Sequence, residues 1–178
     1  MKSSENRSLV KDDILDKNLV TVCGQYCGSC GIYLSTKKSD TIKILEYALV
    51  LNQSFEDTLC EGCRGNKKSA HCSKMCPFIK CSKEKNVNHC GDCKDFPCEK
   101  LLEFQAKMPH RVDILKSLIV LKESGEENWL TDMHKRFSCS NCKTVNSGYD
   151  ISCVKCKRTP GSEFVSEHRS VIEDHLAT

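Results

Sequence analysis

The chain has 178 residues, enough for one domain or two small ones. Hydrophobic residues make up 39% of it and aromatic residues only 6%, which excludes a large single hydrophobic core. The formal net charge of +3 counts every thiol as neutral; each zinc ion held by four thiolates changes it by −2, so two such sites lower it to −1 and three to −3. Whole-chain charge therefore gives no argument for nucleic-acid binding.

Fifteen cysteines give the chain the cysteine content of a scaffold held by disulfides or metals. Residues 1–19 form a polar leader that we expect to be disordered, and it lacks the apolar segment of a signal peptide. No stretch approaches the roughly 18 apolar residues of a membrane span. We therefore expect a cytoplasmic protein with no membrane contact, where cysteines bind metals more often than they form disulfides. The odd cysteine count also fits a disulfide framework poorly.

The first three cysteines follow a short extended segment and have C-x3-C-x2-C spacing. Radical-SAM enzymes use this spacing to hold a [4Fe–4S] cluster. They usually have an aromatic residue where this chain has Ser29, and the chain lacks the alternating strands and helices of their barrel. We therefore interpret Cys23, Cys27 and Cys30 as ligands of a different metal site.

A helix is predicted over residues 39–53, capped by Ser39 or Asp40. Ile42, Leu45 and Leu49 follow a helical stripe, with Ile44, Ala48 and Leu51 beside it, and we expect this helix to pack on the cysteine-rich segment.

Residues 60–98 contain eight cysteines but few large apolar side chains. Burial alone cannot offset the entropy of ordering such a segment, so we expect metal–thiolate bonds to hold it. The predicted ligands here are Cys60, Cys63, Cys72, Cys76, Cys81, Cys90, Cys93 and Cys98.

Three helices are predicted next, and they hold most of the apolar core. The first begins near Pro97, which suits the first helical position and places Cys98 in the first turn, and it ends before Pro109. The second covers residues 111–123 and stops at Gly125. The third covers residues 126–137 and buries Trp129.

Residues 138–160 are predicted to form a zinc ribbon, with two C-x-x-C knuckles on either side of a β-hairpin that turns at residues 146–148. Its ligands are Cys139, Cys142, Cys153 and Cys156. The basic residues around it indicate either a solvated surface or a contact for nucleic acid or an acidic partner. A last helix is predicted within residues 161–178, with His168 and His175 as ordinary packing or surface residues.

The predicted fold is a small, metal-stabilised, α-rich irregular fold of cysteine knuckles and helices, with the ribbon appended. The expected units are the leader (1–19), a cysteine-rich zinc-binding lobe with helices (20–137), the ribbon (138–160) and the C-terminal helix (161–178).

The ordered cysteine series from VCGQYCGSCGIYL through CEGC and CPFIKC to CGDCKDFPCEKL resembles a cysteine-rich microbial family known as a domain of unknown function, DUF3795. The resemblance covers residues 22–102 and ends before the ribbon; some relatives carry a similar ribbon. It implies bound zinc, a cytoplasmic prokaryotic source and no assigned reaction.

The eleven cysteines before the ribbon are one short of three four-ligand sites. We expect Cys81, Cys90, Cys93 and Cys98 to form one local site. Pairs 27/30 and 60/63 would form a second, and the other three thiols a third completed by His71 or His89. Cross-braced sharing of ligands between these groups is an alternative.

The main functional hypothesis is a protein with two to four structural zinc ions that binds a protein or nucleic-acid partner. A second hypothesis is an Fe–S or thiol redox sensor, because the eleven thiols exceed two four-ligand sites by three. A zinc-dependent enzyme is a third, which the absence of H-E-x-x-H argues against.

Overall fold

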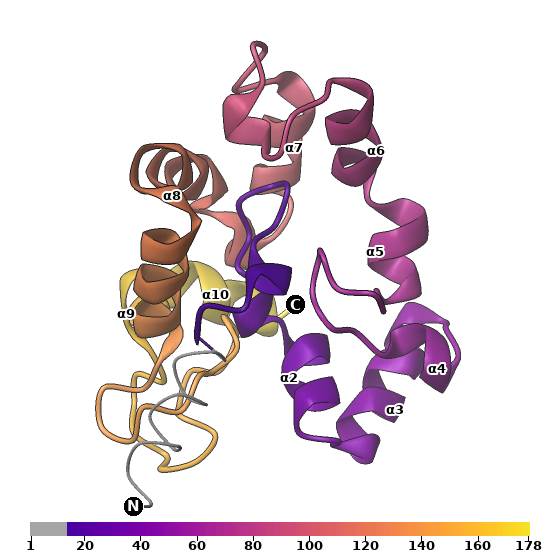
Figure 1. Ribbon diagram of the computed structural model, residues 1–178. Coiled ribbons are helices and arrows are strands. Elements are labelled where there is room, and N and C mark those ends of the chain that lie inside the picture. The colour runs from indigo at the N-terminus through magenta and orange to yellow at the C-terminus, as the bar shows by residue number, and fades with distance from the viewer. Residues whose placement is uncertain (1–13) are drawn as a thin grey trace, which may run out of the picture.

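The computed structural model describes residues 14–178, so the first thirteen residues of the predicted leader lie outside the described residues. Between residues 14 and 178 the chain is rich in helices and contains no β-strand (Figure 1). The α-rich fold expected from the sequence is confirmed. The 3₁₀ helices are η1 (Lys17–Leu19), η2 (Cys27–Ser29), η3 (Cys90–Asp92) and η4 (Pro109–Arg111). The α-helices are α2 (Gly31–Lys37), α3 (Thr41–Leu51), α4 (Phe55–Thr58), α5 (Ala70–Met75), α6 (Pro77–Glu84), α7 (Glu99–Ala106), α8 (Ile114–Phe137), α9 (Glu163–Glu167) and α10 (Arg169–Leu176).

Helix α8 is the centre of the hydrophobic core. It bends at Gly125, whose φ of 78° and ψ of 167° lie outside the helical range, so the two helices predicted on either side of this glycine form one kinked element. The two halves are joined by Trp129, which is fully buried and donates from Nε1 to the Ser117 hydroxyl oxygen at 2.9 Å. Burial of a large apolar side chain contributes roughly 1.5–3 kcal/mol, so this helix supplies much of the core's stability.

The N-terminal segment packs directly on this core. Val20 is fully buried, and the Tyr26 ring meets the Trp129 ring edge-on with centroids 5.9 Å apart. The Ser117 hydroxyl also donates to the Gly24 carbonyl oxygen at 2.7 Å, which fixes the segment to the first half of α8. The segment that carries Cys23 and Cys27 is therefore held by apolar contacts as well as by any metal.

Helix α3 has the predicted position and cap, but it buries a different face. The Asp40 carboxylate accepts from the Lys43 N–H at 3.1 Å, as an N-cap should. The buried side chains are Ile44 and Ala48, which are 2% and 5% exposed. The predicted stripe is wrong, since it stays exposed together with Val50: Ile42 is 72%, Leu45 47% and Leu49 82% exposed. Apolar residues lie almost all round this helix, so contacts with α2 and α4 decide which face is covered.

The C-terminal part follows α8 without a break and folds back on it. The predicted last helix is two helices, α9 and α10, separated at His168. Phe164 of α9 stacks on Phe137 with ring centroids 4.7 Å apart. In the part of the chain that the structure describes, no helix is both long and apolar enough to cross a membrane.

Candidate metal centres

The four ribbon cysteines form the most compact ligand group. Their sulfurs lie within 4.8 Å of one another; Cys139 is 3.6 Å from Cys156, and Cys142 is 3.5 Å from Cys153. All are free thiols, and Cys139 and Cys153 are fully buried. Sulfurs that surround zinc tetrahedrally at about 2.3 Å lie about 3.8 Å apart, so the observed separations fit such a site. This cluster can hold a metal ion.

The two knuckles of this cluster have the same backbone hydrogen bonds. The Cys139 carbonyl oxygen accepts from the Lys143 N–H at 3.0 Å, and the Cys153 carbonyl oxygen accepts from the Lys157 N–H at 2.9 Å. Each lysine has a positive φ, 59° and 62°, a conformation that glycine adopts more readily. The matched turns point both pairs of sulfurs into one space.

Backbone N–H groups also point at the ribbon sulfurs. The Cys139 sulfur accepts from the N–H groups of Asn141 and Cys142. In the same way, the Cys153 sulfur accepts from the N–H groups of Lys155 and Cys156. The Thr144 hydroxyl lies 3.3 Å from the Cys142 sulfur, and together with the Thr144 N–H it lowers the pKa of Cys142 to about 6. Hydrogen bonds of this kind favour the thiolate, which is the form that binds metals.

The predicted hairpin between the knuckles does not form strands among residues 14–178; one antiparallel bridge joins Ser138 and Val145. The connection depends instead on Asn146, which lies in the predicted turn at residues 146–148. This fully buried side chain donates to the carbonyl oxygens of Thr144 and Gly161, each at 2.9 Å, and accepts from the Val154 N–H at 3.0 Å. A buried amide that satisfies three groups joins the two knuckles. In the sequence, the only indication that a side chain links the two knuckles is an asparagine between them.

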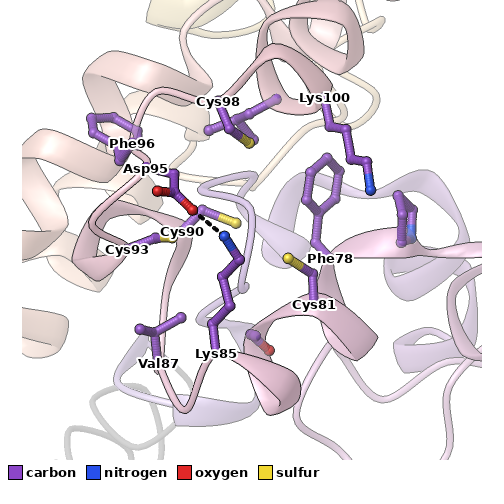
Figure 2. A pocket seen from close by; sticks show the side chains of 13 residues that line it. Phe78, Cys81, Lys85, Val87, Cys90, Cys93, Asp95, Phe96, Cys98 and Lys100 are labelled. Atoms are coloured by element: carbon purple, nitrogen blue, oxygen red, sulfur yellow. Dashed lines mark hydrogen bonds and ion pairs between the residues drawn. The ribbon is translucent and has the colours of Figure 1, made fainter.

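A second group of four cysteines surrounds a cavity of about 40 Å³. Figure 2 shows Cys81 from α6, Cys90 and Cys93 from either end of η3, and Cys98 from the start of α7 around this hollow. The cavity exceeds the roughly 10–15 Å³ that one water molecule needs, so it has room for an ion. These are the four residues predicted to form a local site. No three of these sulfurs lie within 4.8 Å of one another, so they are more widely spaced than the ribbon sulfurs.

Charged groups line the mouth of this cavity. Lys85 reaches across it to pair with Asp95 (Figure 2), and this contact raises the pKa of the Lys85 ammonium. Helix α7 begins at Glu99, so Cys98 is its N-cap and does not lie in the first turn as predicted. Burial, reinforced by the thiols of Cys23, Cys98 and Cys81, raises the pKa of Cys90 to about 12. Such a thiol stays protonated at neutral pH unless a cation binds it.

The seven other thiols occupy the segments around η2, α2 and α5. Among the described residues, the ribbon is the only place where three cysteine sulfurs meet the 4.8 Å separation. His71 is exposed. His89 is buried, but its Nδ1 lies 3.2 Å from Asp92 and its Nε2 lies 3.4 Å from Glu126. Neither histidine therefore joins a compact thiol group in this structure.

A cluster of Asp113, Glu167 and His168 is compact enough for a metal site, but an arginine side chain lies between its members. The Arg136 guanidinium lies between the two carboxylates and pairs with both. His168 Nε2 is 2.7 Å from Asp113. Burial opposes ionisation of Asp113, but the hydrogen bonds from Arg136 and His168 outweigh it and lower the pKa of this carboxyl group. The cluster is an ion-pair network that joins α8 to α9.

Comparison with known proteins agrees with the cysteine pattern. No curated protein and no solved structure matches the chain. Residues 19–103 match the model of a family described as "Protein of unknown function (DUF3795)". The match includes all eleven cysteines before the ribbon and ends before residue 138. It confirms that this segment is similar to the DUF3795 family.

Proposed function

We propose that this protein binds zinc, and that the metal has a structural role. The observation that carries the proposal is the convergence of Cys139, Cys142, Cys153 and Cys156 within 4.8 Å, on two matched knuckles. Four cysteines suit zinc, for which a four-thiolate tetrahedral site is a common structural arrangement. The cavity cluster of Cys81, Cys90, Cys93 and Cys98 supplies a second set of the same composition.

A structural role follows from the donor set. Four thiolates fill a tetrahedral coordination shell and leave no position for an activated water or a substrate. No histidine or carboxylate joins the compact ribbon cluster. Metal binding would therefore contribute folding free energy rather than catalysis. A cytoplasmic location is part of the proposal, because a reducing compartment keeps free thiols available to metal.

The second candidate function is redox chemistry in the segment before residue 103. Seven of its eleven thiols lie outside the cavity cluster, more than one four-ligand site requires. Thiolates in such numbers can hold an Fe–S cluster or respond to oxidants. The Fe–S form of this candidate predicts a visible absorption spectrum, which zinc does not give.

The deciding experiment is metal analysis with a visible spectrum on protein purified without oxygen. We expect colourless protein with at least two zinc ions per chain. The Cys153→Ser variant should lose one zinc, whereas Ser140→Ala, at an exposed position in the same knuckle, should lose none. Brown protein that contains iron and sulfide would favour the redox candidate. Colourless protein without metal would contradict both zinc binding and the Fe–S form of the redox candidate.

We also propose a macromolecular partner, and we expect a protein rather than a nucleic acid. Helix α3 exposes Ile42, Leu45, Leu49 and Val50. Exposed apolar groups of this kind characterise protein interfaces, whereas nucleic-acid binding depends on contacts between basic side chains and phosphates. The expected result is no measurable binding of labelled RNA or DNA near physiological salt. Binding that weakens steeply as salt is raised, and that is lost when the exposed Lys143, Lys155 and Lys157 are changed to glutamine, would overturn this preference.

A further inference from the structure

The turn between the two ribbon knuckles packs against elements outside the ribbon. Gly148 and Tyr149 belong to this turn, and Gly148 is buried. A Cβ added to Gly148 would lie 3.2 Å from the Phe164 ring and 3.5 Å from the His110 Cβ, so the turn lies close to both residues. Phe164 belongs to α9 and His110 to η4, so two elements outside the ribbon contact the turn between its knuckles.

The Tyr149 hydroxyl group is hydrogen-bonded to His110. Its oxygen lies against His110 Nδ1, and the two rings meet edge-on with centroids 5.3 Å apart. The backbone N–H of His110 points at the same oxygen. Burial raises the pKa of the Tyr149 hydroxyl group, although Arg111 and this N–H oppose the change, so the hydroxyl group keeps its proton at neutral pH.

The contact with Arg111 determines which His110 nitrogen carries the hydrogen. The Arg111 Nε–H donates to His110 Nε2 at 3.3 Å, and an arginine side chain has no acceptor atom. Nε2 therefore accepts, so the ring is neutral and its hydrogen is on Nδ1. Burial, reinforced by the charges of Arg111 and His175, lowers the pKa of His110 to about 4, which agrees with a neutral ring at neutral pH. His110 thus donates from Nδ1 to the Tyr149 oxygen.

Arg111 is itself held in place by α7. Its guanidinium group lies over the Phe104 ring, 3.8 Å from the centroid, and Nη1 donates to the Phe104 carbonyl oxygen at 3.5 Å. Helix α7 contains the end of the segment that matches the DUF3795 family. A continuous series of contacts, from Phe104 through Arg111 and His110 to Tyr149, therefore joins the end of that segment to the ribbon.

Hydrogen bonds within the ribbon connect Tyr149 to the metal ligands. The Ser147 N–H donates to the Asp150 carboxylate at 2.7 Å, and the Asp150 N–H donates to the Ser147 carbonyl oxygen at 3.1 Å, so the turn around Tyr149 is closed. Asn146, the residue before this turn, accepts at 3.0 Å from the N–H of the residue that follows Cys153. The position of Tyr149 is thus linked to the position of the second knuckle.

We propose that His110 is a positioning residue for the ribbon metal centre and that it acts through Tyr149. This inference rests on the proposed metal binding by the ribbon and adds a residue that is neither a ligand nor part of the ribbon. The hydrogen bond from Nδ1 holds the turn in the shape in which the two knuckles face each other. Fewer other conformations then compete with the metal-binding one, so the metal leaves the ribbon more slowly.

The coupling between this contact and the metal is reciprocal, because two interactions that favour the same conformation also favour each other. Metal on the four ribbon thiolates holds Tyr149 on His110, and loss of that metal weakens the contact. The environment of the His110 ring therefore depends on whether the ribbon metal is bound, although His110 lies far from the ribbon ligands in the sequence.

Transfer of zinc to a coloured chelator measures the effect, and the kinetic phase that Cys153→Ser lacks identifies the ribbon zinc. Tyr149→Phe and His110→Leu should each make that phase roughly 2-fold to 10-fold faster, the usual effect of one hydrogen bond. His110→Asn should restore a rate near that of the wild type, because its amide nitrogen is as many bonds from the Cα as Nδ1 and donates in its place. His175→Gln is the control and should leave the rate unchanged, since this exposed histidine packs on the Tyr149 ring with centroids 5.7 Å apart.

A long-range proton–nitrogen correlation spectrum of histidine-labelled protein gives a second measurement, which a purely structural role would not predict. In the zinc-loaded wild type at pH 7, we expect a neutral His110 ring with its hydrogen on Nδ1. In Cys153→Ser, which lacks only the ribbon zinc, the nitrogen signals of His110 should shift. Because the first spectrum uses the unaltered protein, misfolding of a variant cannot obscure it.

Four outcomes would overturn the inference. The first is a His110 ring in the wild type that is charged or has its hydrogen on Nε2, and the second is unchanged release of ribbon zinc from Tyr149→Phe. An equal acceleration by His175→Gln would assign the effect to ring packing, and a fast rate in His110→Asn would show that a donor at this position does not matter. In each case zinc in the ribbon leaves the proposed function standing, whereas a Cys153→Ser variant that loses no zinc would contradict the proposed function itself.

Discussion

The ribbon and the segment before residue 103 differ in how far the polypeptide alone brings its thiols together. In the ribbon, two knuckles close to each other in sequence place four sulfurs within 4.8 Å, and backbone N–H groups already point at them. In the longer segment, the thiols come from η2, α5, α6, η3 and the loops between the helices, and they surround their sites more loosely. A local turn can set ligand geometry through its own hydrogen bonds, whereas ligands from distant segments need the metal to draw them together.

Metal removal should have the largest effect and should separate the two regions of the core. Helices α3, α4 and α5 contribute no side chain to the main hydrophobic cluster around Trp129, so little apolar burial holds them in place without metal. After exhaustive chelation, we expect the amides of residues 41–75 to lose most of their protection from hydrogen exchange. The amides of α8 near Trp129 should lose less, because Val20 and Tyr26 still pack there.

Hydrogen exchange measured by mass spectrometry before and after chelation checks this prediction. Metal analysis on the same sample must confirm that the metal has been removed. Unchanged protection of residues 41–75 in metal-free protein would show that metal does not stabilise this region.

The buried amide of Asn146 should matter next, and it tests whether the ribbon is organised by its polypeptide. Asn146→Ala leaves three backbone groups without partners, at a cost of about 1–3 kcal/mol. Faster zinc transfer to a coloured chelator and faster amide exchange of residues 138–160 are expected. Asn141→Ala is the control, because that side chain is exposed in the same ribbon. Equal transfer rates for the two variants would mean that the knuckles do not depend on this link.

A smaller, pH-dependent effect is expected at Thr144. Its hydroxyl helps to hold the pKa of Cys142 to about 6, below the ordinary value of 9.0, so this thiolate is present at neutral pH and is lost as the pH falls through about 6. Thr144→Val raises that pKa, and zinc affinity at pH 7 should fall roughly 10-fold to 100-fold, the usual effect of removing a group that orients a ligand.

Competition titrations with a chelator of known affinity measure the effect of Thr144→Val, with Thr131→Val on the exposed face of α8 as the control. The difference should shrink above pH 9, where the Cys142 thiol ionises in both proteins. An equal loss of affinity at both pH values would assign the effect to packing rather than to the hydrogen bond.

The sequence predicted elements whose signals are local. Asp40 as a helix cap, Gly125 as an interruption and Pro109 as a terminator each act on neighbouring residues, and each has the predicted effect. The cysteine spacing also located the ribbon cluster and the cavity cluster, because a C-x-x-C turn points both sulfurs to one side.

The parts that the sequence did not predict depend on contacts between distant segments. Ile44 rather than Leu49 is buried on α3, since the choice depends on where α2 and α4 pack. Asn146 bonds to Gly161, fifteen residues away, which a turn propensity cannot indicate. The contacts of Cys60 with Thr36 and of Cys63 with Val22 are likewise long-range and do not appear in the spacing.

The two lysines that end the ribbon knuckles affect the reactivity of a metal centre bound there. Lys143 Nζ donates to the Ser140 carbonyl oxygen at 3.0 Å, and Lys157 Nζ donates to the Val154 carbonyl oxygen at 3.1 Å. Each ammonium group is thus folded over the turn that carries its pair of sulfurs. A zinc ion with four thiolates has a charge of −2, and electron-rich sulfurs in such a centre attack alkylating agents and oxidants. Two fixed positive charges and several N–H donors reduce the nucleophilicity of these sulfurs. The ribbon centre should therefore resist alkylation and oxidation, and under oxidative stress it should survive longer than the more open thiols of the cavity.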